Sequence, residues 1–243
     1  IGINKYKSTD PKDRLKMAVK DARDFVRDLM RRAGRLFGED QVAPPELLLD
    51  AQATKAGITA RLAELAERSR PQDVVVVFVA SHGVFEDDVY SIVTHDYKGY
   101  RSRNVLISGA EVLDFSKRIP AQNQLWVFDT CHAGGFDNAL SGLYDSRLTV
   151  LARNVGLHVF ASTNSAQEAQ DSYQGNGLFT HVLRSVMARP ELDANRDGQV
   201  SALEWGEFSR HQTTEIAKRK DYDQTPMILH FGRDLPLYPA GIR

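Results

Sequence analysis

A cysteine and a histidine each follow an apolar stretch that is typical of a buried strand. Cys131, the only cysteine among the 243 residues, comes after LWVFDT, and His82 comes after VVVVFVAS. A thiol is a weak nucleophile until it is deprotonated, and a nearby imidazole can accept its proton or stabilise the thiolate. Because active sites in open α/β sheets form outside the carboxyl ends of the strands, we expect both side chains to meet in one reaction centre.

Each of these residues alone has an ordinary structural interpretation. A lone cysteine is often a small buried apolar side chain, and a lone histidine is often a hydrogen-bonded core or surface residue. Their occurrence together, each after a strand and each near glycine, favours catalysis. The backbone amides of Gly83 and Cys131 are then candidate donors to the oxyanion of an acyl-transfer intermediate. His132 is not expected to take part, because neighbouring side chains diverge.

The elements that must position these residues follow from the hydrophobic pattern. Strands alternate with amphipathic helices, which predicts a doubly wound α/β sheet in a single domain covering residues 1–243. Gly34 is expected to stop the first helix, and residues 89–94 to form a small exposed hairpin. The expected strands are 46–49, 73–80, 125–129, 157–161 and 227–232, and the expected helices are 14–33, 108–119, 178–188, 202–218 and one capped by Thr54.

Composition narrows the class of protein. Hydrophobic residues make up 42% and charged residues 26%, as in globular proteins, and a net charge of -1 gives no case for binding nucleic acid or an acidic membrane. No apolar run approaches the roughly 20 residues that span a bilayer. A single cysteine excludes an internal disulfide and fits a reducing, cytoplasmic location. The chain starts at Ile1 without a methionine and is interpreted as an excerpt that begins inside a strand. An upstream regulatory domain and an activating protease are candidate partners.

Six stretches, taken in order, resemble the bacterial caspase-like cysteine peptidases of the caspase and metacaspase superfamily. They are IGINKY, AVKDARDF, VVVVFVASHG, VFDTCHAGG, GLFTHVL and DQTP. The distance from His82 to Cys131 also agrees with the spacing known for caspases. The resemblance implies a caspase-like three-layer sandwich, with a central, mostly parallel sheet of about six strands and helices on both faces. It also implies that Cys131 is the nucleophile and His82 the general base or acid.

The resemblance further implies which bond is cut. Caspases carry glutamine two residues before the nucleophile and bind aspartate, whereas metacaspase-like members carry aspartate there and cleave protein or peptide substrates after Arg or Lys. This chain has Asp129 at that position, and Asp21 is the best match to a second acid of the same S1 pocket. A carboxylate binds Arg bidentately or Lys as a point charge. Asp129 could instead cap a turn, and Asp21 could be an ordinary acid on a helix. Arg147 and Arg153, after the cysteine, are candidate self-cleavage sites.

A second motif has the spacing of a calcium-binding loop. The stretch DANRDGQVSALE, residues 193–204, matches the EF-hand pattern at every specified position, and it would form an EF-hand-like loop inserted near the C-terminal part of the domain. The expected ligands are the side chains of Asp193, Asn195, Asp197 and Glu204 and the carbonyl of Gln199. The alternative is a turn with helix-capping acids, since no second loop is present to pair with it. We expect no cofactor for the chemistry itself and Ca²⁺ only as a modulator.

Two other functions share some of these features. A non-catalytic, calcium-responsive interaction domain would need the fold and the 193–204 loop, although such a domain would usually have lost the cysteine or the histidine. A cysteine esterase or acyltransferase would use Cys131 and His82 but would leave Asp129 without a role.

Overall fold

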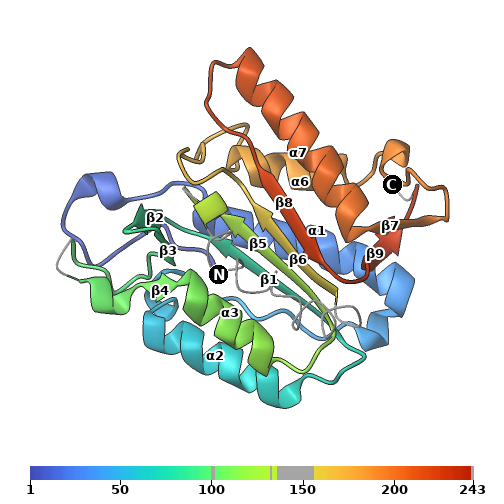
Figure 1. Cartoon of the computed structure of the whole chain (residues 1–243), viewed down its shortest axis with the longest axis horizontal. Helices are drawn as coiled ribbons and strands as arrows, with labels where there is room; N and C mark the ends of the chain where they lie inside the picture. Colours follow the sequence, from blue (N-terminus) through green and yellow to red (C-terminus); the bar gives the residue numbers. More distant parts are fainter. Residues whose placement is uncertain (100–101, 132, 136–155, 242–243) are drawn as a thin grey trace.

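A four-stranded sheet forms the centre of the structure. A computed structural model describes residues 1–99, 102–131, 133–135 and 156–241, and in it the strand order is β1 (Val74–Ala80), β5 (Asn123–Asp129), β6 (Gly156–Ala161) and β8 (Met227–Phe231) (Figure 1). The pairs β1–β5 and β5–β6 are parallel, and β8 runs antiparallel to β6. The sheet is therefore mostly parallel, as expected.

Two short segments extend this sheet beyond β1. Gly2 makes isolated parallel bridges to Ala80 and to Leu49, so the chain start lies between β1 and the 46–49 segment, which was expected as a strand. The backbone amide of Gly2 donates to Leu48 O at 3.0 Å, and that of Ile3 donates to Ala80 O at 3.0 Å. The sheet of about six strands that the resemblance implied is thus four strands and two segments that pair through single bridges.

Helices cover both faces of the central sheet and make it the middle of three layers. Side chains alternate across β1, so that Val77 and Val79 belong to one core and Phe78 and Ala80 to the other. Because helices cover both faces of the sheet, β1 and β5 carry apolar residues at successive positions and do not alternate apolar with polar residues. One face packs against α2 (Lys55–Arg68) and α3 (Gly109–Arg118), and the other against α1 (Ala18–Phe37), α6 (Leu178–Val186) and α7 (Ala202–Arg219) (Figure 1).

Two smaller sheets lie beside the central one. The first has the order β2 (Gly83–Glu86), β3 (Val89–Ile92) and β4 (Ile107–Ser108), and the second pairs β7 (Gln199–Ser201) with β9 (Pro236–Pro239). A hairpin is present, but it consists of β2 and β3, so residues 89–92 are its second strand only, and the expectation that it is exposed was wrong. Tyr90 and Ile92 of β3 are only 1% and 3% exposed, because this side of the hairpin packs against the core.

The helix ends show which capping signals were reliable. Thr54 accepts from Gly57 N at 3.0 Å and caps α2 as predicted, and Ser108 caps α3. The expected stop at Gly34 was wrong, because α1 continues to Phe37 and ends at Gly38, whose φ of 91° favours glycine. A glycine inside a helix lowers its stability by about 1 kcal/mol but does not terminate it.

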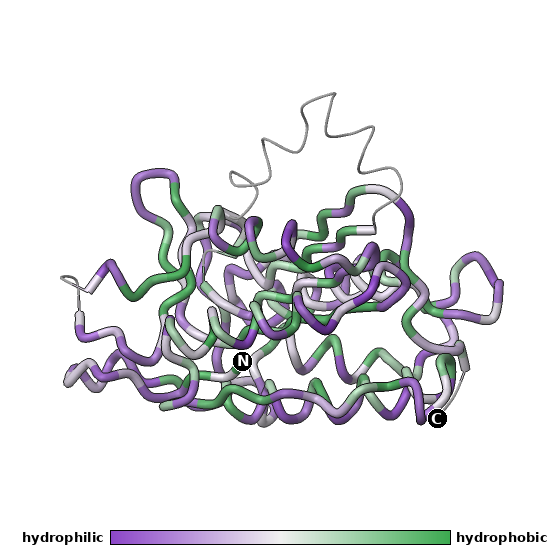
Figure 2. Tube along the Cα trace, turned by 90° about the horizontal axis from the view of Figure 1, so that it is seen from below, coloured by the Kyte–Doolittle hydropathy of each residue, from purple (hydrophilic) through white to green (hydrophobic). Residues whose placement is uncertain are grey.

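Short 3₁₀ turns connect these elements. They are Pro11–Asp13, Glu39–Gln41, Asp50–Gln52, Arg103–Val105, Ala133–Gly135 and Pro190–Leu192. Hydrophilic residues are frequent along the loops that project from the molecule (Figure 2). Among the helices of the described residues, none combines the length and the apolar character needed to cross a bilayer.

Candidate active site

Strand register places the histidine and the cysteine at equivalent positions. Ala80 at the end of β1 pairs with Asp129 at the end of the neighbouring parallel strand β5. His82 and Cys131 each follow two residues later, so both leave the sheet at the same edge. Both line one pocket with an empty volume of about 310 Å³. The structure therefore brings the two predicted residues together despite their separation in sequence.

His82 is held from two sides. Its Nε2 lies 3.0 Å from the carbonyl oxygen of Asp13, and its backbone amide donates to the Tyr6 hydroxyl at 2.8 Å. A carbonyl only accepts hydrogen bonds, so Nε2 carries the proton, and in the neutral ring Nδ1 keeps the lone pair needed by a base. Burial lowers the pKa of His82, partly offset by the hydrogen bond to Asp13. The imidazole is therefore neutral at pH 7.

Cys131 is partly buried and has one hydrogen-bond donor. The backbone N–H of Ala169 donates to its Sγ at 3.4 Å. Burial raises the pKa of the Cys131 thiol, partly offset by this N–H, and the nearby carboxylates of Glu168 and Asp129 raise it further. A neutral thiol next to a neutral imidazole is the resting pair expected for general-base activation, in which the proton moves as the substrate is attacked.

The backbone of Gly83 lies directly against that of Cys131. A Cβ built on Gly83 would stand 2.2 Å from the Cys131 carbonyl oxygen and 2.9 Å from Thr130 Oγ1, so a larger residue does not fit there. The Tyr90 hydroxyl, hydrogen-bonded to Thr130 Oγ1 at 2.7 Å, supports the same turn. The structure accounts for this glycine by its close approach to the cysteine loop. Oxyanion binding by the two amides stays a prediction.

Asp21 and Asp129 lie together at one side of the same pocket. A Cβ built on Gly177 would stand 3.0 Å from Asp129 Oδ2 and 3.1 Å from Asp21 Oδ2, so both carboxylates approach the same point. Asp129 Oδ2 also accepts from Thr180 N at 3.1 Å and from Thr180 Oγ1 at 2.5 Å, and Asp21 accepts from Asn176 Nδ2 at 2.6 Å. The two acids are thus fixed by the start of α6 and the residues just before it.

Burial raises the pKa of both carboxyl groups. Asp21 and Asp129 are only 2% and 8% exposed, and the charge of Asp129 raises the pKa of Asp21 further. Within the described residues, neither carboxylate forms an ion pair with Lys, Arg or His. Two buried acids without a cation form a site that a cationic ligand can complete.

The segment after β6 forms one wall of this pocket. Ala169, Gln170, Asp171 and Gly177 line it together with Ala18 from the start of α1 and Leu15 just before that helix. Asp171 is fixed there because it accepts from the backbone amides of Lys16 at 2.7 Å and Met17 at 3.2 Å. Residues of the 169–177 segment therefore line the same pocket as the nucleophile.

Comparison with known proteins assigns this arrangement to a family. The caspase domain model matches residues 1–231, nearly the whole chain. The chain belongs to the caspase-domain family. It is accordingly a caspase-like cysteine peptidase in the general sense, as the resemblance of its sequence stretches implied. No curated protein matches the chain.

A solved structure shows the same fold. The crystal structure of protein GSU0716 from Geobacter sulfurreducens matches this caspase domain with a TM-score of 0.61, over 96% of this chain and 91% of that chain. The two sequences are 17% identical, so the likeness concerns the fold alone.

The calcium-loop residues of this caspase domain lie outside the pocket, between α6 and α7. Their carboxylates accept backbone hydrogen bonds: Asp193 from Asp197 and Gly198, and Glu204 Oε1 from Ala194 and Asn195. The described part of the chain contains no group of three or more His, Cys, Asp or Glu arranged to hold a metal ion. The donor set is all oxygen, as Ca²⁺ prefers, but the three acids do not converge. Calcium binding stays a prediction.

Three predicted positions lie outside the described residues. They are the candidate self-cleavage sites Arg147 and Arg153, and His132, which was expected to have no catalytic role.

Several residues that support the site could not be found from the sequence. The Tyr6 hydroxyl and the Asp13 carbonyl hold His82, but their contacts span 76 and 69 residues. Gln224 of the DQTP stretch is buried and accepts from Gln170 N at 3.0 Å, which fixes the pocket wall, while its Nε2 donates to Ser162 O. The only available signal was that Tyr6 and Gln224 fall inside stretches that resemble the family, and Asp13 lies outside all of them.

Proposed function

We propose that this caspase domain is an endopeptidase that cleaves protein or peptide substrates after Arg or Lys. The observation that carries the proposal is the pair of buried carboxylates, Asp21 and Asp129, beside Cys131 and His82 in one pocket. A neutral or acidic P1 side chain would leave both carboxylates buried without a cationic partner, whereas a guanidinium or ammonium group offers several donors and a positive charge.

The reaction would begin with the P1 cation between the two carboxylates. His82 Nδ1 accepts the thiol proton as Cys131 Sγ attacks the scissile carbonyl carbon. The backbone amides of Gly83 and Cys131 donate to the developing oxyanion. The imidazolium then returns the proton to the leaving amine, which departs as the C–N bond breaks. Water, deprotonated by His82, hydrolyses the remaining thioester and regenerates the thiol.

The environment of the S1 acids supports a preference for a cation. Both carboxylates have raised pKa values through burial, and an entering Arg or Lys would favour their ionised forms. Asp171 adds a third negative charge to the pocket lining. A cysteine esterase acting on neutral acyl groups would not use these charges, so the acids favour the peptidase over that alternative.

Calcium modulation and self-processing are further parts of the proposal. The backbone of the 193–204 loop turns through Arg196 and Gly198, with φ values of 61° and 85°, and Glu204 reaches back to the loop from the first turn of α7. These features support an EF-hand-like loop in which Ca²⁺ would replace backbone amides as the partner of the carboxylates. Cleavage at Arg147 or Arg153 rests on the preference for arginine alone.

A panel of fluorogenic peptides that differ only at P1 tests the proposal. Arg, Lys, Asp and Ala substrates are compared with and without Ca²⁺, using the wild-type protein and the Cys131→Ala and His82→Ala variants. His211→Ala is the matched control, because this histidine is exposed on α7. We expect cleavage after Arg and Lys that is lost in the first two variants and kept in the control. Cleavage after Asp, or a folded protein inactive under all conditions, would contradict the proposal and favour a non-catalytic domain.

A further inference from the structure

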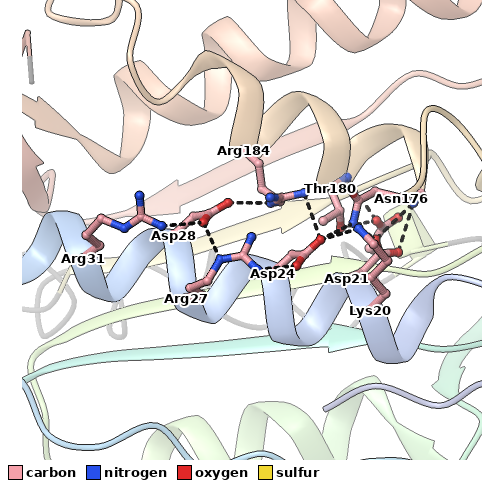
Figure 3. Close-up of polar contacts among 11 residues, drawn as sticks. Lys20, Asp21, Asp24, Arg27, Asp28, Arg31, Asn176, Thr180 and Arg184 are labelled. Atoms are coloured by element: carbon pink, nitrogen blue, oxygen red, sulfur yellow. Dashed lines mark hydrogen bonds and ion pairs between the residues drawn. The ribbon is translucent and has the colours of Figure 1, made fainter. Parts of the chain in front are cut away.

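Two neighbouring aspartates of α1 have opposite electrostatic surroundings. Asp24 has three cationic partners: Lys20 Nζ at 2.5 Å, Arg27 Nη1 at 2.8 Å and Arg184 Nη1 at 3.1 Å (Figure 3). Burial acts to raise its pKa, but hydrogen bonds from Lys20 and the charge of Arg184 leave that pKa below its usual value. Asp21, one turn earlier, has no cation among the described residues, and its pKa is raised. Another side chain must therefore separate the nearby guanidinium of Arg184 from Asp21.

The side chain of Asn176 lies between these groups. Its Nδ2 donates to Asp21 Oδ1 at 2.6 Å and to Asp24 Oδ2 at 3.2 Å, while its Oδ1 accepts from Arg184 Nη1 at 2.6 Å (Figure 3). This pattern allows one orientation of the amide, because carboxylates only accept and a guanidinium only donates. The guanidinium itself is directed to Asp24 and, through Nε, to Asp28 at 2.7 Å.

The backbone fixes Asn176 in this position. Residues 173–176 form a tight turn in which Tyr173 N donates to Asn176 O at 2.6 Å and Asn176 N donates to Tyr173 O at 3.1 Å. Gln174 and Gly175, with φ values of 48° and 85°, occupy the two positions of the turn that need positive φ. The next amide, that of Gly177, donates to Asp21 Oδ2 at 3.0 Å. Asn176 is 2% exposed, so water does not replace its contacts.

We propose that Asn176 is a specificity-positioning residue, whose amide holds Asp21 as a charged acceptor for the P1 cation and separates it from Arg184. This inference rests on the proposed function of the S1 acids and adds a residue that does not itself touch the substrate. It explains why a buried acid, with an arginine one amide away, remains available to a ligand.

Removal of the amide would weaken cation binding by two routes. Without the donor from Asn176, Asp21 is protonated more readily, and raising the pH reverses this loss. Without the intervening amide, Arg184 can turn from Asn176 towards Asp21 and compete with the substrate, and raising the pH does not reverse that loss. Loss of a hydrogen bond to a charged group corresponds to about a tenfold change in affinity or more.

The test measures binding rather than turnover. In a Cys131→Ala background, isothermal titration calorimetry compares an acetylated tripeptide amide ending in Arg with the same peptide ending in citrulline, at pH 6, 7 and 8.5. Citrulline has nearly the shape of Arg without the charge. The variants are Asn176→Ala and, to keep a hydroxyl donor in the turn if alanine impairs folding, Asn176→Ser. Ser172→Ala is the matched control, because Ser172 is exposed in the same loop.

We expect the parent to prefer the Arg peptide and Asn176→Ala to bind it about tenfold more weakly at pH 7, with citrulline binding unchanged. The change at pH 8.5 then tells which of the two routes dominates. An equal loss for both peptides would indicate a merely structural role and overturn the inference, as would unchanged Arg binding. A parent that does not distinguish Arg from citrulline would instead overturn the proposed P1 specificity, and the inference with it.

Discussion

Replacing Gly177 with alanine should block the S1 site and leave the nucleophile unaffected. The φ of −61° and ψ of 149° at Gly177 suit alanine, and its N–H, which donates to Asp21, is retained. The new Cβ, however, would stand 3.0 Å from Asp129 Oδ2 and 3.1 Å from Asp21 Oδ2. A methyl group at this distance pushes the carboxylates by a few tenths of an ångström and takes space that the P1 cation needs.

The size of the effect follows from how sharply binding depends on position. Since a misplacement of about 1 Å can cost about 100-fold in rate, we expect kcat/KM for an Arg substrate to fall by about 10- to 100-fold, mainly through KM. Cleavage of a P1-Ala substrate should change less than about twofold, because alanine does not reach the carboxylates.

The assay compares kcat and KM for matched Arg and Ala substrates in wild type, Gly177→Ala and the control Ser172→Ala. Alkylation of Cys131 by iodoacetamide checks the nucleophile without using the S1 site. Normal Arg cleavage by a folded Gly177→Ala variant would refute the assignment of S1 to this point of the pocket. Equal losses for the Arg and Ala substrates would refute it as well.

Four further outcomes are expected. In pH profiles, kcat/KM for an Arg substrate should rise through pH 7 and level off at about pH 8, because burial raises the pKa values of Asp21 and Asp129 to about 7 and about 6. For a P1-Ala substrate, kcat/KM should level off at a lower pH, because this substrate does not use the two acids and burial lowers the pKa of His82. Identical profiles for the two substrates would contradict this. In the folded state Asp129 holds its proton up to a higher pH than in the unfolded chain, so its burial lowers stability as the pH rises from 3.8 to about 6. Asp129→Asn should therefore stabilise the protein by about 3 kcal/mol at pH 8 but not at pH 4, as measured by urea unfolding. Tyr6→Phe leaves the partly buried N–H of His82 without its acceptor and should lower the free energy of unfolding by about 1–3 kcal/mol. In kinetic assays the same change should lower kcat more than it raises KM. An unchanged kcat would show that the hydroxyl does not position the histidine. Millimolar Ca²⁺ should raise the melting temperature of the wild-type protein but not of Asp193→Ala, whereas equal shifts in both would exclude the 193–204 loop as the calcium site.

The meeting of His82 and Cys131 was predictable because it depends on strands. Both β1 and β5 are apolar runs whose carboxyl ends can be located in the sequence, and parallel neighbours in one sheet end at the same edge. The sequence could therefore place the two residues near each other. The residues proposed for the P1 pocket could be found only through the family resemblance, which pointed to Asp129 and Asp21.

The remaining parts of the site depend on contacts between distant loops. Asn176 reaches Asp21 across 155 residues, and no periodicity in the sequence carries that information. The pairing of β7 with β9 was also missed, because strands of three and four residues are too short to show a hydrophobic pattern. The wrong stop at Gly34 has another cause: a local helix-ending signal was outweighed by packing of the α1 face against β1 and β9.

The most direct test of the account is active-site labelling with a peptidyl chloromethyl ketone that carries Arg at P1, in which Sγ bonds to the methylene carbon as chloride leaves, compared with the same reagent carrying Asp. Peptide mapping by mass spectrometry shows which residue is modified and how fast. The account predicts that the Arg reagent modifies Cys131 alone, that His82→Ala and Asp129→Asn slow the reaction, and that the Asp reagent reacts poorly. Faster labelling by the Asp reagent, or labelling at any residue other than Cys131, would contradict it.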